Sequence, residues 1–183
     1  MTTTPPVPEF SVRVIVAELD GEPRDYSIAA DESERKALAK RFDLLALDRL
    51  EADVTVSPRR GSDIVGVTGR FEADVVQACV VTLEPVPATV TGDFDRTFAS
   101  PHLCALDHVV EIDPDREDPP DPITDGSIDI GEVVAEHMGL ELEPFPRAPG
   151  AEFESTQNGG EGAAGATDTK PNPFAILEKL KDR

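Results

Sequence analysis

The chain has 183 residues, with 37 Asp and Glu against 17 Lys and Arg, and its formal net charge is −20. Because affinity for nucleic acids and anionic lipids comes largely from Lys and Arg, this charge disfavours broad, direct binding of RNA, DNA or membranes. A basic protein partner stays open, and so does the simpler interpretation that the excess of acid only keeps the chain soluble.

The N-terminal residues 1–8 are rich in Thr and Pro, which predicts a disordered tail. They lack the basic and apolar parts of a secretion signal. The longest apolar runs are four residues, as in residues 14–17, far short of the ~20 that span a bilayer. We therefore expect a cytoplasmic protein that crosses no membrane, with reduced cysteines at Cys79 and Cys104.

Residues 10–17 alternate between apolar and polar side chains, which predicts a strand. A turn signal at residues 21–23 precedes a second short strand through residues 26–30, and together they suggest a hairpin. Asp31 and Glu34 have the spacing of a capping box, so a helix is expected from there to about Phe42.

Three further segments, 50–57, 65–79 and 86–98, follow a period of two and are separated by short turns. This pattern predicts an antiparallel meander. Because the middle segment is long, Gly66 and Gly69 are expected to mark a bulge or bend. The predicted class is α+β: a mostly antiparallel meander sheet, open or barrel-like, packed with two helices.

Acid is concentrated between residues 107 and 143, where thirteen carboxylates face only Arg116. Residues 107–127 contain several prolines and are expected to form an exposed acidic loop. Asp129 and Glu132 then form a second capping pair. The helix that they begin should dock its apolar side on the sheet and end before Pro144 and Pro146.

The C-terminal part divides into two segments, which follow an α+β domain of residues 9–146. Residues 147–169 are rich in Gly, Ala, Ser, Thr and Glu, so they are expected to be a flexible linker. Residues 170–183 carry an apolar stripe from Phe174 to Leu180, which predicts a short helix.

Enzyme signatures are mostly missing from the sequence. It has no phosphate-binding glycine loop, nucleophile elbow or paired-histidine zinc helix, so no catalytic residue and no cofactor is assigned. One alternative stays open, because His102, Cys104 and His108 fall within seven residues and Cys79 is a potential fourth zinc ligand. Such a site would make the protein a metal-dependent hydrolase or nuclease.

Four short segments carry a resemblance to a known family. They are residues 79–86, the helix start at 128–132, the helix exit at 143–146 and the terminal residues 172–177. In combination they resemble the bacterial YceD family of large ribosomal RNA subunit accumulation proteins, over most of the chain. Many members carry Cys-x-x-Cys before the Leu-Glu-Pro position, whereas Cys79 and Thr82 stand at those two places here. This departure argues against an obligatory metal or redox pair in this chain.

The resemblance implies a role in the synthesis, processing or stability of 23S ribosomal RNA, with no established enzymatic activity. Combined with the charge, it suggests an adaptor whose acidic residues 111–143 engage a basic ribosomal protein or large-subunit assembly factor, so that contact with rRNA is indirect. The terminal helix would dock in a groove of the partner, or else fold back on its own sheet. A general acidic chaperone for basic proteins is a further alternative. The candidate partner-binding residues are Cys79, Leu83, Glu84, Pro85, Asp129, Glu132, Asn172, Pro173, Phe174 and Leu177.

Overall fold

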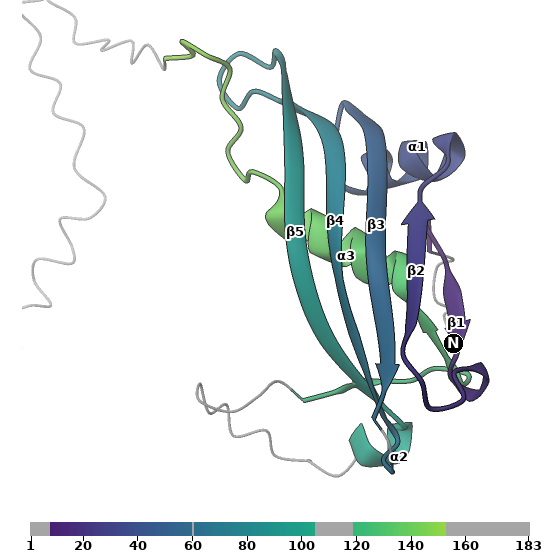
Figure 1. Ribbon diagram of the computed structural model, residues 1–183. Helices are drawn as coiled ribbons and strands as arrows, with labels where there is room; N and C mark the ends of the chain where they lie inside the picture. The colour runs from purple at the N-terminus through teal and green to yellow at the C-terminus, as the bar shows by residue number, and fades with distance from the viewer. Residues whose placement is uncertain (1–7, 60, 105–118, 153–183) are drawn as a thin grey trace, which may run out of the picture. The chain divides into compact units, whose positions relative to one another are not determined.

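The computed structural model describes residues 8–59, 61–104 and 119–152 (Figure 1). The chain divides into two units, residues 1–151 and 152–183, and the description below concerns the first. Its elements in chain order are β1 (Arg13–Ile15), the 3-10 helix η1 (Val16–Glu18), β2 (Arg24–Ala29), α1 (Glu32–Arg41), β3 (Ala46–Pro58), β4 (Ile64–Ala78), β5 (Pro85–Ala99), α2 (Pro101–Cys104), β6 (Asp121–Pro122), β7 (Ser127–Asp129) and α3 (Ile130–Glu141).

Most strands belong to one five-stranded sheet with the order β2-β3-β4-β5-β6. All of its pairings are antiparallel except the short one between β5 and β6. Within the described residues the sheet does not close on itself, so the α+β class is confirmed and the structure contains an open sheet rather than a barrel. The strands β3, β4 and β5 form the expected meander.

The core lies between one face of the meander and α3, which crosses behind the strands in Figure 1. Alternate residues of the strands, such as Val54, Val67 and Phe71, point into this core, because successive side chains of a strand face opposite sides of the sheet. From α3, Val134 and Met138 complete it. The opposite face of the meander is polar, and no helix of the described residues lies over it (Figure 1).

The helices predicted from the capping pairs at Asp31 and Asp129 are confirmed. At α1 the Asp31 side chain accepts from the amides of Ser33 and Glu34, and the Glu34 side chain accepts from the Asp31 amide. At α3, Asp129 is the N-cap and accepts from the Glu132 amide. The short helix α2, which follows β5, was not predicted.

The hairpin predicted for residues 10–17 and 26–30 is wrong. β1 pairs instead with β7, with Val14 opposite Ile128, while β2 pairs with β3. Two bonds explain the choice: the Val12 amide donates to the Asp129 carboxylate at 2.9 Å, and the Ile130 amide donates to the Val12 carbonyl at 2.9 Å. The N-terminal strand is therefore fastened to the start of α3.

Of the bulge or bend predicted at Gly66 and Gly69, the bulge is not present. β4 keeps one register with β5 along its whole length, and the only shift against β3 lies between Leu47 and Arg49. Gly69 serves packing instead: a Cβ there would lie 2.6 Å from the Phe94 ring. Gly92 gives the same room to Phe71 on the neighbouring strand. Each aromatic ring thus covers a glycine that lies opposite it in the ladder.

Several predicted segments fall outside the described residues. They are residues 1–7 of the N-terminal tail, residues 105–118 of the acidic loop, the linker from residue 153 onward and the terminal segment 170–183.

Candidate functional site

The turn between β4 and β5, residues 79–84, holds the first group of predicted site residues. The Cys79 amide donates to the Glu84 carbonyl at 2.8 Å, and the Leu83 amide donates to the Cys79 carbonyl at 2.9 Å. Leu83 adopts a φ of 63°, an uncommon conformation for a side chain of this size. The turn thereby leaves the Leu83 side chain 77% exposed.

The Cys79 thiol sits buried inside this turn. Its Sγ accepts from the amide of Ala148 at 3.3 Å and from the amides of Val81 and Thr82 at 3.4 Å each. These donors, that of Ala148 first, lower the pKa of the Cys79 thiol to about 6, because they stabilise the thiolate. The sulfur is therefore an acceptor that joins the turn to the chain beyond α3.

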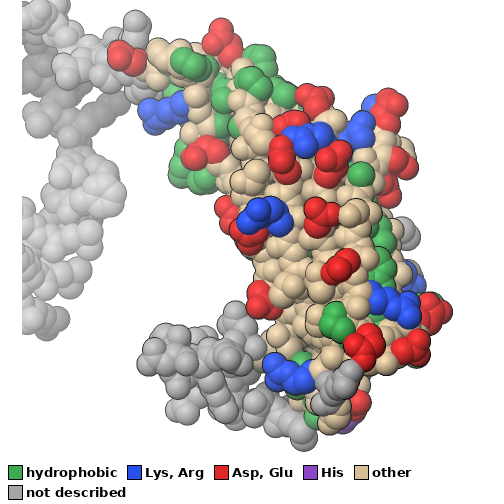
Figure 2. Space-filling model, viewed as in Figure 1, with side chains coloured by type: hydrophobic (Ala, Val, Ile, Leu, Met, Phe, Trp, Pro, Cys, Tyr) green, Lys and Arg blue, Asp and Glu red, His purple; other side chains and the backbone are tan. Residues whose placement is uncertain are grey.

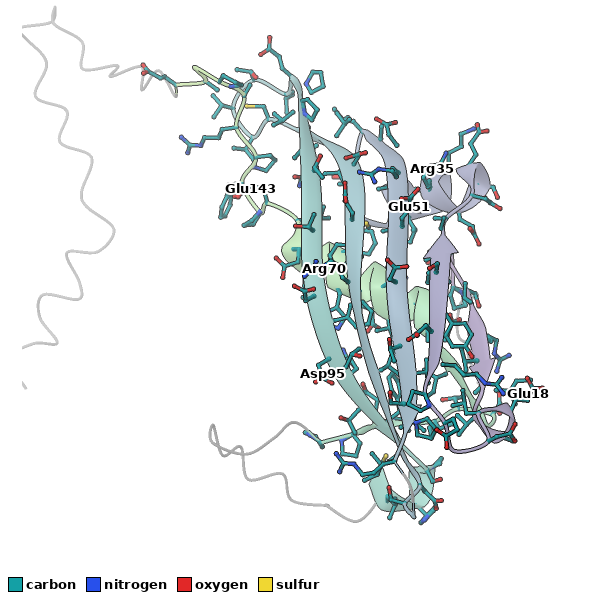
Figure 3. The ribbon with its side chains drawn as sticks, in the orientation of Figure 1. Glu18, Arg35, Glu51, Arg70, Asp95 and Glu143 are labelled. Carbon is teal, nitrogen blue, oxygen red and sulfur yellow. The ribbon has the colours of Figure 1, made fainter. Side chains whose placement is uncertain are left out.

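The exit of α3 is bound to the same turn by two further bonds. The Val80 amide donates to the Pro146 carbonyl at 2.9 Å, and the Gln77 side-chain amide donates to the Glu143 carbonyl at 2.9 Å. Phe145, in this exit segment, is 70% exposed. Figure 3 labels Glu143 at this end of the sheet. The structure thus brings two of the four resembling segments, 79–86 and 143–146, into contact.

Asp129 and Glu132 lie at the opposite end of α3, about 18 Å away at 1.5 Å per helical residue. Besides capping the helix, Asp129 accepts from the Ser11 hydroxyl at 2.6 Å. Glu132 binds both terminal nitrogens of Arg41, at 2.8 and 3.0 Å. Both carboxylates thus fasten α3 to β1 and α1. The other four candidate residues, Asn172, Pro173, Phe174 and Leu177, lie outside the described residues.

The residues of the alternative zinc site are not assembled in the part that the structure describes. Cys104 Sγ lies 3.4 Å from the Pro120 carbonyl, and His102 Nε2 lies 3.6 Å from an Asp63 oxygen. Cys79 stands at the other end of β5, about 50 Å away at 3.3 Å per residue, so it is no fourth ligand. Among the described residues no three His, Cys, Asp or Glu side chains gather as metal ligands do. His108 lies outside them.

The uncovered face of the sheet holds an acidic surface that the sequence reasoning missed. Figure 2 shows acidic side chains spread over this face with few basic ones between them, and Figure 3 labels Glu51, Arg70 and Asp95 on it. We define the acidic face by its carboxylates: Asp25, Glu51, Asp53, Glu72, Asp74, Asp93 and Asp95. The alternation of the strands was the available signal, because it assigns all seven to one side of the sheet.

Two arginines hold this face together. Arg49 binds Asp74 at 2.8 Å and also binds Glu72, which lies directly opposite Glu51 in the ladder. It thereby separates two like charges that would otherwise repel. Arg70 binds Asp93 at 2.8 Å.

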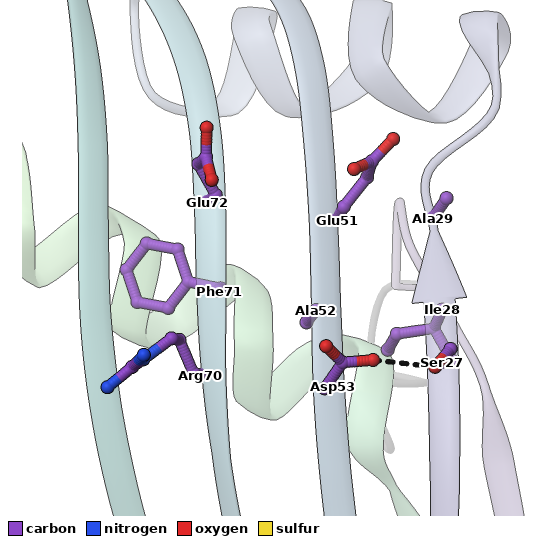
Figure 4. A pocket seen from close by; sticks show the side chains of 9 residues that line it. All are labelled: Ser27, Ile28, Ala29, Glu51, Ala52, Asp53, Arg70, Phe71 and Glu72. Carbon is purple, nitrogen blue, oxygen red and sulfur yellow. Dashed lines mark hydrogen bonds between the residues drawn. The ribbon is translucent and has the colours of Figure 1, made fainter.

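A hollow of about 310 Å³ lies on the same face over β2, β3 and β4 (Figure 4). Its polar lining includes Glu51, Glu72 and Arg70, and the Ser27 hydroxyl donates to Asp53 at 2.6 Å. Such a lining suits a basic side chain better than an anion.

Comparison with known proteins decides the family. A model described as the large ribosomal RNA subunit accumulation protein YceD matches residues 67–181, more than half of the chain. The chain belongs to the YceD family. The match confirms the resemblance seen in the sequence, and the family name implies a role in the accumulation of large-subunit ribosomal RNA.

The matched range takes in most of β4, all of β5 and α3, and with them the turn at Cys79 and the exit of α3. No curated protein and no solved structure matches the chain. Helices in the described ranges are all too short or too polar to span a bilayer.

Proposed function

We propose that this YceD-family protein is a non-enzymatic factor of ribosome biogenesis that acts in the cytoplasm by binding a basic ribosomal protein or large-subunit assembly factor. Through that partner it supports the synthesis, processing or stability of 23S rRNA and touches the RNA only indirectly. The family name supports the link to large-subunit rRNA. The charge supports the indirect contact, because a body with a net charge of −20 repels a polyanion.

The observation that carries the proposal is the acidic face. Seven carboxylates lie on one side of the sheet, and among the described residues of that side only Arg49 and Arg70 balance them. A preformed field of one sign speeds and orients association with a partner of opposite sign. Many ribosomal proteins are basic because they neutralise phosphate, which makes them fitting partners for this face.

Full-length protein, immobilised and challenged with proteins extracted from purified large ribosomal subunits, tests the proposal. At about 0.15 M salt we expect a small set of basic proteins to bind, and at about 0.5 M salt we expect this binding to weaken, since the Debye length shrinks. Naked 23S rRNA should not bind at either concentration. Retention of naked rRNA at high salt contradicts indirect contact, and unselective retention of all basic proteins indicates a general chaperone.

Two matched sets of substitutions separate the acidic face from the overall charge. Asp25→Asn, Asp53→Asn and Asp95→Asn together remove three charges from the face. Glu18→Gln, Asp43→Asn and Asp125→Asn remove three charges elsewhere; Asp43 and Asp125 have positive φ values of 54° and 53°, which Asn also tolerates. We expect the first set to weaken binding of the basic proteins by about tenfold and the second to leave it within about twofold. Equal losses would mean that only net charge matters.

A further inference from the structure

One side of β5 carries an open strand edge. All fifteen residues of β5 pair with β4, but on the other side only Phe98 and Ala99 pair, with β6. Within the described residues, the preceding residues of β5 therefore have no strand beside them on that side, and Figure 1 shows β5 at the edge of the meander. Such an edge is a template for an added strand.

The parity of the ladder shows which backbone groups face this open side. At one end the Glu84 carbonyl bonds toward β4, through the Cys79 amide. At the other end the Ala99 carbonyl bonds away from β4, to the Ile123 amide. Because the two directions alternate along a strand, odd-numbered residues of β5 face outward. Pro85 and Pro87, which have no amide hydrogen to give to β4, agree with this parity.

We define the open edge of β5 as Thr89, Thr91, Asp93 and Asp95, whose amides and carbonyls point away from β4. We propose that an extended segment of a basic protein adds to this edge as a further strand. The proposal rests on the proposed function and specifies how the basic partner is held. The chain itself demonstrates that the edge takes a strand, since β6 continues the sheet at Phe98 and Ala99.

The charges beside the open edge of β5 favour a basic segment as the added strand. Asp93 and Asp95 project from the edge onto the acidic face, and Glu141 of α3 lies below it, its γ carbon 3.2 Å from the place of a Cβ on Gly92. An added strand with Lys or Arg at alternate positions turns these side chains to one face, where they meet Asp95 and Asp93, the latter already paired with Arg70. A second copy of β5 would instead set these aspartates against each other. Residues 105–118 of the same chain carry six acids and one Arg and are disfavoured for the same reason.

Proline at an outward position tests the strand addition. Thr91→Pro removes one outward amide and sets a ring against the incoming strand, yet it spares the bonds to β4, as Pro87 does at the same parity. Thr91→Val is the matched control, because it keeps the amide. With proteins extracted from large ribosomal subunits as the probe, we expect the Thr91→Val protein to bind like the wild type and the Thr91→Pro protein to bind at least about tenfold less.

Hydrogen exchange on the wild-type protein gives a second measurement that does not depend on how the proline variant folds. When the retained basic protein is added, exchange should slow at the amides of Thr89, Thr91, Asp93 and Asp95. The amides of Val90 and Phe94, already bonded to β4, should not change. If exchange slows equally at both sets of amides, or slows at neither, no strand has been added.

The two proposals fail in different ways. If the wild type retains no basic protein, the proposed function falls and the strand addition falls with it. If the wild type and Thr91→Pro proteins retain the same amount, only the strand addition is wrong and the adaptor role stands. A wild-type dimer that Thr91→Pro converts to a monomer would assign the edge to a second copy and contradict the proposal.

Discussion

Cys79 is the residue in which the turn and the exit of α3 meet. Its sulfur is buried and accepts from three amides, one of which, that of Ala148, lies just beyond the exit segment 143–146. A sulfur with such donors is stabilised as a thiolate, which explains a pKa of about 6. The residue thus contributes to the fold through its charge as well as through its volume.

The stability that the Cys79 thiolate contributes should depend on pH. The pKa is lowered in the folded protein, so the contribution is present above the pKa of the unfolded thiol, near 9, and is lost as pH falls through about 6. We expect the difference in free energy of unfolding between the wild type and Cys79→Ser to increase from pH 6 to pH 9, measured with urea. Cys104→Ser is the control, and a difference that is constant with pH contradicts the thiolate.

His137 presents the opposite case, a buried group that favours its neutral form. Its ring stacks on Phe94 with the centroids 5.0 Å apart, and Nε2 is buried with no hydrogen-bond partner among the described residues. Burial lowers the pKa of His137, helped by Arg96 and opposed by Glu136 and Glu141. Protonation at this position therefore costs stability.

Substituting His137 tests that cost. Because its pKa is lowered on folding, the protein should lose stability as pH falls below the ordinary value of 6.5. His137→Phe keeps an aromatic ring at this position and removes the unpaired nitrogen. We therefore expect the free energy of unfolding to rise by about 1 kcal/mol at pH 8 and by more at pH 5. Urea unfolding at the two pH values measures this. Equal gains would show that His137 does not titrate in this range.

At the scale of elements, the packing of the long strands depends on glycines over which aromatic rings of the neighbouring strand lie. A Cβ on Gly69 would meet both the Phe94 ring at 2.6 Å and the backbone oxygen of Asp53 at 2.7 Å. Backbone cannot move aside cheaply, so strain is unavoidable there. Gly66, three residues earlier on β4, has only the Ser57 oxygen within reach, at 3.8 Å.

These two glycines form a matched pair for mutation. We expect Gly69→Ala to cost about 2 kcal/mol of unfolding free energy, the usual magnitude for overpacking. Gly66→Ala should be neutral or stabilise by about 0.5 kcal/mol, because alanine restricts the unfolded chain. Thermal or urea unfolding of both variants measures the contrast. Similar effects would mean that the Phe94 ring moves aside freely.

Local signals in the sequence were sufficient to predict the helices and strands but not to predict which strands pair with each other. The capping pairs at Asp31 and Asp129 and the alternation of the meander predicted α1, α3 and three strands. The pairing of β1 with β7 could not be predicted from the sequence, because it depends on a hydrogen bond from the Val12 amide to the Asp129 carboxylate, 117 residues away. Gly69 was misjudged for the same reason, because its role comes from a ring on the next strand.

The candidate site was predicted only in part. Sequence similarity drew attention to residues 79–86 and 143–146, and the structure brings them together. Asp129 and Glu132 were grouped with them, but Glu132 pairs with Arg41, a contact that a sequence cannot reveal. The acidic face was overlooked because acid is densest between residues 107 and 143, whereas on the strands it is spread over four segments that folding brings side by side.

At the scale of the whole molecule, the two faces of the sheet differ in polarity. The face toward α3 buries Val, Leu and Phe side chains, while the opposite face is acidic and no helix in the described part of the chain covers it (Figures 1 and 2). The open edge of β5 borders that face. The proposed basic partner, attracted by the acidic face, would therefore meet the edge of β5, which among the described residues pairs with β6 only at Phe98 and Ala99.

The pairing of β1 with β7 joins residues far apart in the chain. Each turn of the meander joins strands that are neighbours in the sequence, whereas Arg13 pairs with Asp129 and the whole meander lies between them in the sequence. Closing so long a loop costs more entropy than closing a hairpin, so the N-terminal strand should dock last. Val67→Ala, in the meander, should slow folding, and Val14→Ala, in β1, should speed unfolding instead. Stopped-flow kinetics distinguish the two, and slower folding of Val14→Ala would reverse the order.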